Sequence, residues 1–393
     1  MPTDSVKEVG ARIAAGRRAR RLSQPQLAAA AAVSLPMIRA IERGARNPSD
    51  STLEAIAEVL RVDATRLRTG YVGTTRRVHG AFPAISAAIA GYDIPQGQPA
   101  KSPLELAAAV GDTERKRLAA QYGSIAQDVP GLLHDAIRYV HTAPHGERTA
   151  AARMLASVAR SADAVAYKYG QLDLSARLID LMCWAADRSG DPLLAMTWAY
   201  VRTETFFAAR AHEVGLTALE HAIEAAPAPT TRIQAAARGA LHMRAAVIAA
   251  RGANVAAADD HLDEARAYGQ QVVEGSYLGT QFGPDSVRIH ELSLAVSLGR
   301  EYVDRALRVP TEWKPPASMP AERRSGFYIE LARAQEWAGL PDHAFESLKV
   351  ARAAAPQHTR EHPWARATAE SLRRFHRRDA ESLTHFAEWI GAV

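Results

Sequence analysis

The chain has 393 residues and a net charge of +5, and 47% of its residues are hydrophobic but only 6% aromatic. Its single cysteine, Cys183, excludes an internal disulfide and suits a reducing cytoplasm. No stretch of about 18 apolar residues is present that could span a membrane, and residues 1–8 lack the apolar core of a secretory signal. The composition therefore predicts a cytoplasmic protein, and its alanine and leucine content favours helices.

The positive charge is concentrated at the N-terminal end of the chain. Residues 1–77 contain 14 Lys+Arg and 7 Asp+Glu, whereas the rest of the chain contains 34 Lys+Arg and 36 Asp+Glu. A basic N-terminal region on a nearly neutral remainder indicates a polyanionic partner for that region.

Five short helices are expected in this basic region, the head (residues 1–70). Ser23 is a good N-cap, and Gln26 three residues later completes a capping box. Ser34 is placed to cap the next helix, which ends before Gly44, where a left-handed residue suits a helix C-terminus. The expected helices span residues 6–20, 23–31, 34–43, 52–60 and 64–68.

Two of these helices are joined by a three-residue turn, which is the helix-turn-helix plan, whose second helix enters the major groove of DNA. From Val9 to Leu60 the sequence resembles, without gaps, the phage-repressor-like (XRE) family of DNA-binding regulators. The residues that carry this resemblance are Gly10, Arg12, Ile13, Arg17, Arg20, Leu22, Ser23, Gln24, Leu27, Ala28, Val33, Ser34, Ile38, Ile41, Glu42, Gly44, Arg46, Pro48, Ser49, Leu53, Ile56 and Ala57.

The resemblance implies which residues contact DNA. Gln24 matches a residue that binds a phosphate and steadies the recognition helix, and the loop at residues 43–47 lies where the family meets the DNA backbone. Phosphate contact and a solvated basic face are both open interpretations for Arg17 and Arg21. The implied DNA-contacting residues are Arg17, Arg21, Gln24, Ser34, Leu35, Met37, Arg39, Arg43, Arg46 and Asn47.

The recognition helix departs from the polar pattern of phage repressors. Among its base-reading positions only Arg39 can make a bidentate contact with guanine, while Leu35 and Met37 can at most touch thymine methyl groups. Ala32 stands where the family has a turn glycine, so we expect a mildly strained left-handed alanine there. DNA shape and phosphate contacts are therefore expected to carry much of the recognition.

A glycine- and proline-rich linker (residues 71–103) follows, with one short helix expected at residues 82–89. The body (residues 104–393) reads as consecutive helices, with no alternating run long enough to predict a strand. Its tight turns recur at intervals of 41, 41, 47 and 40 residues, which is typical of helical repeats. We therefore expect an all-α chain, a five-helix helix-turn-helix domain followed by a tetratricopeptide-like α-solenoid. The turns lie near Gly170, Ala211, Gly252, Gly299 and Gly339.

The whole chain is similar to actinobacterial regulators that join such a head to a tetratricopeptide-like sensor body. The phrases from Phe282 to Arg300 and from Ala321 to Gly339 carry this similarity. It implies a homodimeric transcriptional regulator that binds double-stranded DNA with inverted half-sites under the control of an effector. Peptide-sensing regulators share the two-part plan and commonly hold the peptide with asparagine amides, but the body contains only Asn254, although Gln234, Gln281 and Gln335 are amides that could substitute. A small molecule bound in the repeats is therefore favoured over a peptide.

A break in the repeat around residues 275–284 is the candidate ligand site. Aromatic side chains on this glycine-rich loop can line a pocket, or they can fill the gap between two helices, and both interpretations remain open. Likewise, Arg288 can face a ligand or pair with Glu291. The candidate ligand-binding residues are Trp198, Arg202, Tyr277, Phe282 and Arg288.

Catalytic chemistry is not expected, because the sequence has neither a phosphate loop nor a dinucleotide fingerprint, and we expect no cofactor. His358 and His362 match a reversed zinc-protease pattern in letters, but Pro356 and Pro363 bracket them, which predicts a turn without a metal. The alternative to a ligand-responsive regulator is a protein-interaction scaffold, whose repeats hold a partner protein while the head tethers it to DNA.

Overall fold

The computed structural model describes residues 6–60, 67, 74–94, 97–375 and 380–392. The chain forms two compact units, which divide between His79 and Gly80. Regular structure in the described residues is almost entirely helical, as the composition predicts. None of the described helices is both long and apolar enough to cross a membrane.

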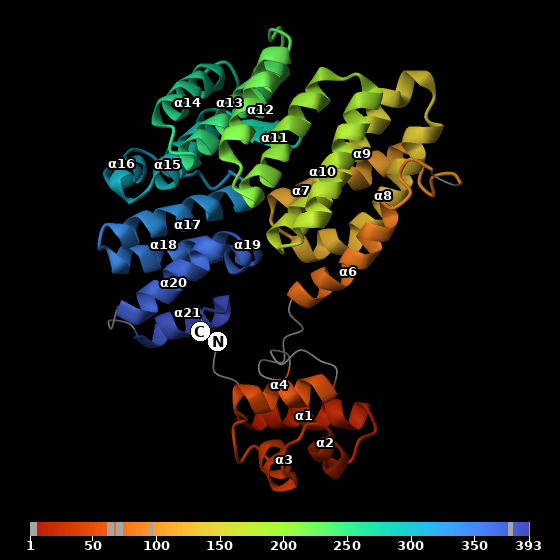
Figure 1. Cartoon of the computed structure of the whole chain (residues 1–393), viewed down its shortest axis with the longest axis vertical. Coiled ribbons are helices and arrows are strands. Elements are labelled where there is room, and N and C mark those ends of the chain that lie inside the picture. The colour runs from red at the N-terminus through yellow and green to blue at the C-terminus, as the bar shows by residue number, and fades with distance from the viewer. Residues whose placement is uncertain (1–5, 61–66, 68–73, 95–96, 376–379, 393) are drawn as a thin grey trace. The chain divides into compact units, whose positions relative to one another are not determined.

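Four helices form the described part of the head (Figure 1). They close around a core in which Leu27 and Ile38 are fully buried, and Gly10 lets α1 lie directly against α3. The expected fifth helix, residues 64–68, lies outside the described residues except for Leu67, which is helical and buried. The helices are α1 (Val6–Ala19), α2 (Gln24–Ala30), α3 (Leu35–Glu42) and α4 (Asp50–Val59).

The linker contains α6 (Thr74–Ala88), which begins earlier than the helix expected at residues 82–89. Val78, Phe82 and Ile85 form one buried stripe along it at helical spacing. The first half of the helix is polar except for Val78, so its apolar periodicity was too sparse to predict it.

Helical hairpins build the body (Figure 1). The helices are α7 (Pro103–Leu118), α8 (Tyr122–Thr142), α9 (Arg148–Lys168), α10 (Leu172–Ser189), α11 (Pro192–Ala209), α12 (His212–Ala225), α13 (Arg232–Arg251), α14 (Val255–Gly269), α15 (Pro284–Leu298), α16 (Val303–Glu312), α17 (Ala321–Trp337), α18 (Pro341–Ala354), α19 (Pro356–Glu361), α20 (Pro363–Phe375) and α21 (Ala380–Ile390), with short 3₁₀ turns η1 (His145–Glu147) and η2 (Arg300–Tyr302).

These helices stack in two layers. The two helices of each hairpin pack on each other, and the first helix of each hairpin also packs on the first helix of the next. One layer therefore contains α7, α9, α11, α13, α15, α17 and α20, and we call it the inner layer because α17 also contacts α7. The outer layer contains α8, α10, α12, α14, α16, α18 and α21. This arrangement is the α-solenoid that the repeat predicts.

The turns predicted from the repeat are confirmed, because each lies between the two helices of one hairpin. Gly170 and Gly339 are left-handed, both with a φ of 74°, which suits a residue without Cβ. Arg210 and Ala253 take the left-handed conformation at two other turns, with φ values of 54° and 59°. The repeat is therefore more regular in backbone conformation than in sequence.

The inner layer curls until its beginning meets its later helices. The hydroxyl of Tyr122, at the start of α8, donates to Glu322 of α17 over 3.1 Å, and the Lys168 amine at the end of α9 lies 3.3 Å from the same carboxylate. The backbone N–H of Gly123 donates to Gln357 of α19 over 3.2 Å. These bonds join segments that are about half the chain apart in sequence.

A β-hairpin interrupts the repeats where only a glycine-rich loop was expected. Strands β1 (Gly275–Tyr277) and β2 (Thr280–Phe282) pair antiparallel through a two-residue turn, Leu278 and Gly279, whose φ values are 51° and 74°. Three-residue strands are too short to give an alternating pattern, so the expectation of no strand was wrong here.

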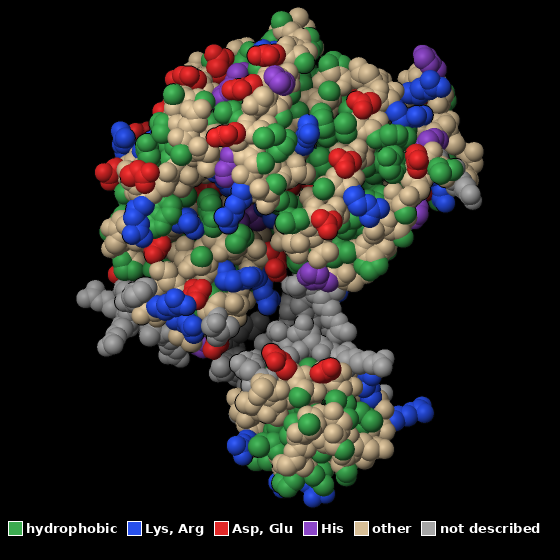
Figure 2. Space-filling view, viewed as in Figure 1, with side chains coloured by type: hydrophobic (Ala, Val, Ile, Leu, Met, Phe, Trp, Pro, Cys, Tyr) green, Lys and Arg blue, Asp and Glu red, His purple; other side chains and the backbone are tan. Residues whose placement is uncertain are grey.

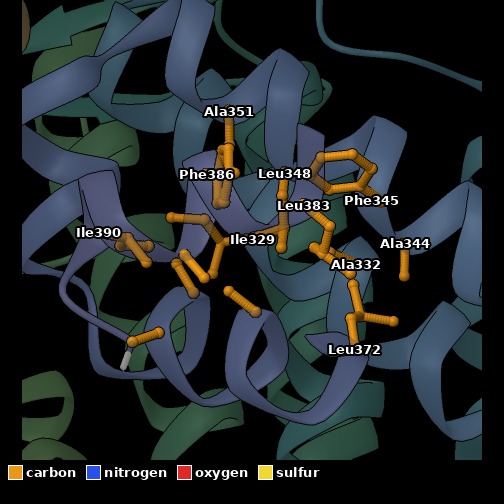
Figure 3. Packing of buried hydrophobic residues seen from close by; sticks show 14 residues of the cluster. Ile329, Ala332, Ala344, Phe345, Leu348, Ala351, Leu372, Leu383, Phe386 and Ile390 are labelled. Atoms are coloured by element: carbon orange, nitrogen blue, oxygen red, sulfur yellow. The ribbon is translucent and has the colours of Figure 1, made fainter. Parts of the chain in front are cut away.

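The C-terminal hairpins have their own apolar core (Figure 3). Leu348 and Phe345 of α18 meet Ile329 of α17 and Phe386 of α21 in this cluster, and Phe345 and Phe386 lie edge to face with centroids 5.6 Å apart. The interdigitation of four helices explains why the last hairpin stays packed on the array.

Close packing around Gly239 generates a stability prediction. A Cβ at Gly239 of α13 would lie 2.1 Å from Cζ of Phe282, so we expect Gly239→Ala to lower the free energy of unfolding by about 1–3 kcal/mol. Urea denaturation measures this change, and Phe282→Leu in the same chain should recover part of it. The matched control is Gly131→Ala at an exposed position of α8, where no atom lies within 4 Å, and it should stabilise slightly. Equal effects of the two alanines would contradict the packing account.

Candidate functional site

The turn between α2 and α3 has the geometry that the sequence predicts. The capping box of Ser23 and Gln26 is present, and it fixes the start of α2. Ala32 is left-handed with a φ of 51°, and Gly44 is left-handed after α3 with a φ of 69°. A left-handed alanine costs about 1–2 kcal/mol, so packing on both sides of the turn must hold it in place.

An ion pair inside the head fixes the C-terminal end of α3. Arg17 of α1 donates through Nε to one Glu42 oxygen over 2.7 Å and through Nη2 to the other over 2.9 Å. Gln24 of α2 donates to the same carboxylate over 2.8 Å. The two charged side chains are only 13% and 5% exposed. Three helices are therefore joined at one carboxylate.

The charges of this network are mutually stabilised. Burial alone would raise the pKa of Glu42, but hydrogen bonds from Arg17 and Gln24 and the nearby positive charge lower it. The hydrogen bond to Glu42 raises the pKa of Arg17. The guanidinium of Arg17 also donates to the Leu22 carbonyl, so it has partners within the head, and its phosphate contact stays a prediction. Gln24 contacts α3 through Glu42, and its phosphate contact stays a prediction.

The surface around α3 carries most of the residues that the resemblance implies. Leu35 and Met37 are half-buried against the head core, so only their edges are accessible. The hydroxyl of Ser34 makes no capping hydrogen bond, although Ser34 stands at the N-cap position. The exposed members of the set are Arg21, Ser34, Arg39, Arg43, Arg46 and Asn47.

Charge is polarised across the head. Figure 2 shows basic side chains along the lower edge and both sides of the head and acidic side chains over α4 on the visible face. The exposed acids of α4 are Glu54 and Glu58, whereas α3 and the loop after it expose Arg39, Arg43 and Arg46. An approaching polyanion is therefore attracted to the α3 side and repelled from the α4 side.

In the body, the five residues proposed for ligand binding do not form one group. Arg202 lies on α11 between the rings of Trp198 and Phe206, 5.1 and 5.2 Å from their centroids. The Tyr277 hydroxyl donates to the carbonyl of Val273 in its own hairpin. Among the described residues, no hydrogen bond, ion pair or ring contact joins Trp198 or Arg202 to the hairpin or to α15.

Phe282 and Arg288 have structural partners of their own. Phe282 is fully buried and fills the space above Gly239, as in the interpretation in which the loop aromatics plug a gap. Arg288 donates to Glu291 over 2.9 Å and to Glu312 over 3.2 Å. Both residues therefore have partners within the protein, and ligand binding at them stays a prediction.

His358 and His362 lie at a short helix rather than at a turn. Pro356 and Pro363 occupy first-turn positions, where a missing N–H costs little, so they begin α19 and α20 instead of ending helices. Nε2 of His358 accepts from the Lys168 amine over 3.1 Å, and Nδ1 hydrogen-bonds to the hydroxyl of Ser325 over 3.0 Å. Within the described residues no three His, Cys, Asp or Glu side chains are grouped to hold a metal.

Comparison with known proteins identifies the head. Residues 13–67 match the helix-turn-helix family, so the N-terminal region is a helix-turn-helix domain. No curated protein matches the chain. One similar solved structure is PlcR of Bacillus thuringiensis in complex with the peptide PapR7 and DNA, with 16% identity and a TM-score of 0.25, covering 67% of this chain and 95% of that one. Another is the apo form of the competence regulator ComR from Streptococcus vestibularis, with 11% identity and a TM-score of 0.28, covering 99% and 100%.

The Glu42 network generates a prediction about the head. Glu42→Ala removes the carboxylate that accepts from Arg17 and Gln24 and leaves the partly buried Arg17 charge without its ion pair, so we expect the head to lose about 2–4 kcal/mol of its free energy of unfolding. Amide hydrogen exchange of α1 and α3 measures this loss. Glu58→Ala, at an exposed position of α4, is the control and should change exchange by less than about 0.5 kcal/mol. Unchanged exchange in Glu42→Ala would show that the network does not hold the helices together.

Proposed function

We propose that this protein is a sequence-specific, dimeric transcriptional regulator whose DNA affinity is modulated by an effector bound in the body. The observation that carries the DNA-binding part is the exposed basic surface of α3 and its following loop, in a domain of the helix-turn-helix family. In this family plan, α3 lies in the major groove and α2 crosses the backbone.

Different residues are proposed for affinity and for sequence choice. Arg43, Arg46 and Asn47 are exposed after α3 and would contact phosphates, which gives affinity and salt dependence. Arg39 is the exposed side chain of α3 with a guanidinium fork that matches the O6 and N7 acceptors of guanine. The hydroxyl of Ser34, which makes no capping hydrogen bond and is exposed, is a further donor at the N-terminus of α3.

The partly buried apolar residues of α3 limit direct readout. Leu35 and Met37 bury much of their side-chain surface against the head core. Little more than a methyl edge of each is left to contact bases in the major groove. A regulator with one strong base contact per head needs two heads to reach tight, selective binding, which supports the dimer.

The scaffold alternative remains distinct from this proposal. In it, the repeats bind a partner protein and a small molecule has no effect on DNA affinity. The Arg-rich interior of the body, described below, favours the small-molecule interpretation, because a ligand enclosed by the inner layer cannot be a folded protein. Fluorescence anisotropy of labelled operator DNA, with and without candidate metabolites, separates the two functions.

Substitution of the two classes of DNA contact should give different profiles. Arg39→Ala should relax the base preference at one position of each half-site by roughly 1–3 kcal/mol. Arg46→Ala should weaken binding to all sequences alike and reduce the slope of log affinity against log salt by about one unit. Selection from a randomised duplex library measures both effects. An unchanged base profile in Arg39→Ala would mean that readout is indirect.

The dimer proposal predicts the form of the operator. Full-length protein should protect two inverted half-sites whose centres lie about one helical turn apart, and it should bind with two chains per duplex. Footprinting and light scattering of the complex measure the spacing and the stoichiometry. Tight binding of one chain to a single half-site would contradict the dimer.

A further inference from the structure

A cluster of arginines surrounds one tyrosine in the inner layer of the body. The guanidinium carbon of Arg244, on α13, lies 4.6 Å from the ring centroid of Tyr200 on α11, and that of Arg160, on α9, lies 5.5 Å from it. Arg323 of α17 donates to the Tyr200 hydroxyl over 3.4 Å. We call these four residues the arginine cluster. Three helices of the inner layer therefore bring cationic donors to a tyrosine on a fourth.

The positive charges of the cluster are poorly balanced by the protein itself. Arg160 and Arg323 form no ion pair among the described residues, and Arg244 has only a loose one, 3.6 Å from Glu204. Nε of Arg244 is buried without a hydrogen-bond partner in the described part of the chain. A buried guanidinium N–H that lacks an acceptor is costly, so it is normally met by protein, water or ligand.

The other carboxyl groups that act on the cluster have partners of their own or raised pKa values. Glu114 acts on Arg160 and accepts from Ser276, and Glu274 acts on Arg323 and accepts from Ser286. Glu322 accepts from Tyr122 and pairs with Lys168. Burial raises the pKa of Glu330 to about 7, and burial together with Glu204 raises the pKa of Asp163 well above its usual range. Neither group supplies a full negative charge to the arginines near neutral pH.

The pKa of the Tyr200 hydroxyl reflects the positive charges around it. Burial would raise the pKa of its hydroxyl, but Arg244, Arg323 and Arg160 lower it to about 8. Burial and the charge of Arg117 lower the pKa of Arg160 to about 9, since the cations also repel one another. An environment that strengthens the acidity of a buried phenol stabilises negative charge on oxygen at this position.

The cluster is not fully closed off from solvent. The side chain of Arg244 is 18% exposed and Arg323 is half-buried, whereas Tyr200 is buried. A cavity of about 250 Å³ nearby is lined by the acids Asp173 and Glu204 and by none of the four cluster residues, so it is not the site of an anion.

We propose that the arginine cluster is the binding site of a small organic anion that carries carboxylate or phosphate groups. Its oxygens would accept hydrogen bonds from the planar guanidinium forks of Arg244 and Arg323, and from the Tyr200 hydroxyl. Bound negative charge removes the repulsion among the three arginines and draws α9, α11, α13 and α17 together. The claim that this anion is the effector rests on the proposed function. The claim that it binds at the cluster does not.

The β-hairpin gives the site a connection to the rest of the inner layer. Arg160 also donates to the carbonyl of Leu278 over 3.1 Å and to the hydroxyl of Thr280 over 2.8 Å, and Arg117 of α7 donates to the Gly279 carbonyl over 2.6 Å. An anion that engages Arg160 competes with the left-handed turn at the hairpin tip. Ligand binding is thereby coupled to the contact between β1–β2 and the first helices of the body.

Binding is tested on the full-length protein without DNA. Sodium citrate, sodium pyrophosphate and inorganic phosphate are titrated at constant ionic strength, and calorimetry and thermal unfolding are recorded. We expect saturable binding of citrate if carboxylates are recognised, or of pyrophosphate if phosphates are, with a rise in melting temperature. Arg323→Gln and Arg244→Gln should each weaken the dissociation constant at least tenfold. The matched control is Arg232→Gln, an exposed arginine of α13 outside the cluster, which should leave it unchanged. Absence of saturable binding by all three anions overturns the proposal, as does an equal loss in Arg232→Gln.

A second readout uses the wild-type chain and does not depend on the folding of arginine variants. Tyrosinate absorbance is titrated with pH in wild type and in Tyr200→Phe, and the difference isolates Tyr200. Its midpoint near pH 8 should move toward 10 when the anion saturates the site, because the neutralised arginines no longer favour the phenolate. An unmoved midpoint under saturating anion places the ligand elsewhere and overturns the assignment.

DNA affinity with and without the same anion is measured separately. A changed affinity supports the effector role. If the anion binds at the cluster but DNA affinity does not change, the assignment of the binding site stands and only its regulatory role is overturned.

Discussion

The architecture of the body follows from one constraint, that a single helical hairpin cannot bury its own apolar stripe. Each hairpin must lie on the next, and the small side chains of the inner layer let the helices approach closely. On α13, Ala236, Ala245 and Ala249 are buried, and Gly239 admits the ring of Phe282. Long side chains such as Arg244 then project from the same helix into the enclosed space. Close stacking and a charged interior are therefore two results of the same arrangement.

The head uses a different device, because its helices are short and its core is small. The Glu42 carboxylate receives bonds from α1 and α2 while belonging to α3, so it fixes the recognition helix relative to both neighbours. Glu42 makes its hydrogen bonds to Arg17 and Gln24 within the domain. The exposed arginines of α3 and the loop after it are not engaged by this carboxylate and can contact an external molecule. The exposed acids of α4 complete this polarity, so the domain presents one face to a polyanion.

The sequence predicted features that depend on local rules. The capping box at Ser23, the left-handed Ala32 and the repeat turns follow from short-range chemistry, and the structure confirms them. Contacts between distant helices could not be predicted in this way. Arg17 reads as a surface cation in a basic segment, but its partner Glu42 lies 25 positions away. The arginine cluster gave no signal at all, since each of its members comes from a different helix and none belongs to a local motif.

The bonds that join α8 and α9 to α17 and α19 change what kind of folding unit the body is. An open array is nearly one-dimensional, and its repeats can fray, be lost or be duplicated one at a time. Here the contacts of Tyr122 and Gly123 with Glu322 and Gln357 span 200 and 234 positions. Such high contact order delays their formation, because a long loop must close first, and it makes the finished ring cooperative. A closed body of this kind loses the modularity of an open one, so insertions and deletions of whole repeats are excluded from its evolution unless the ring is broken.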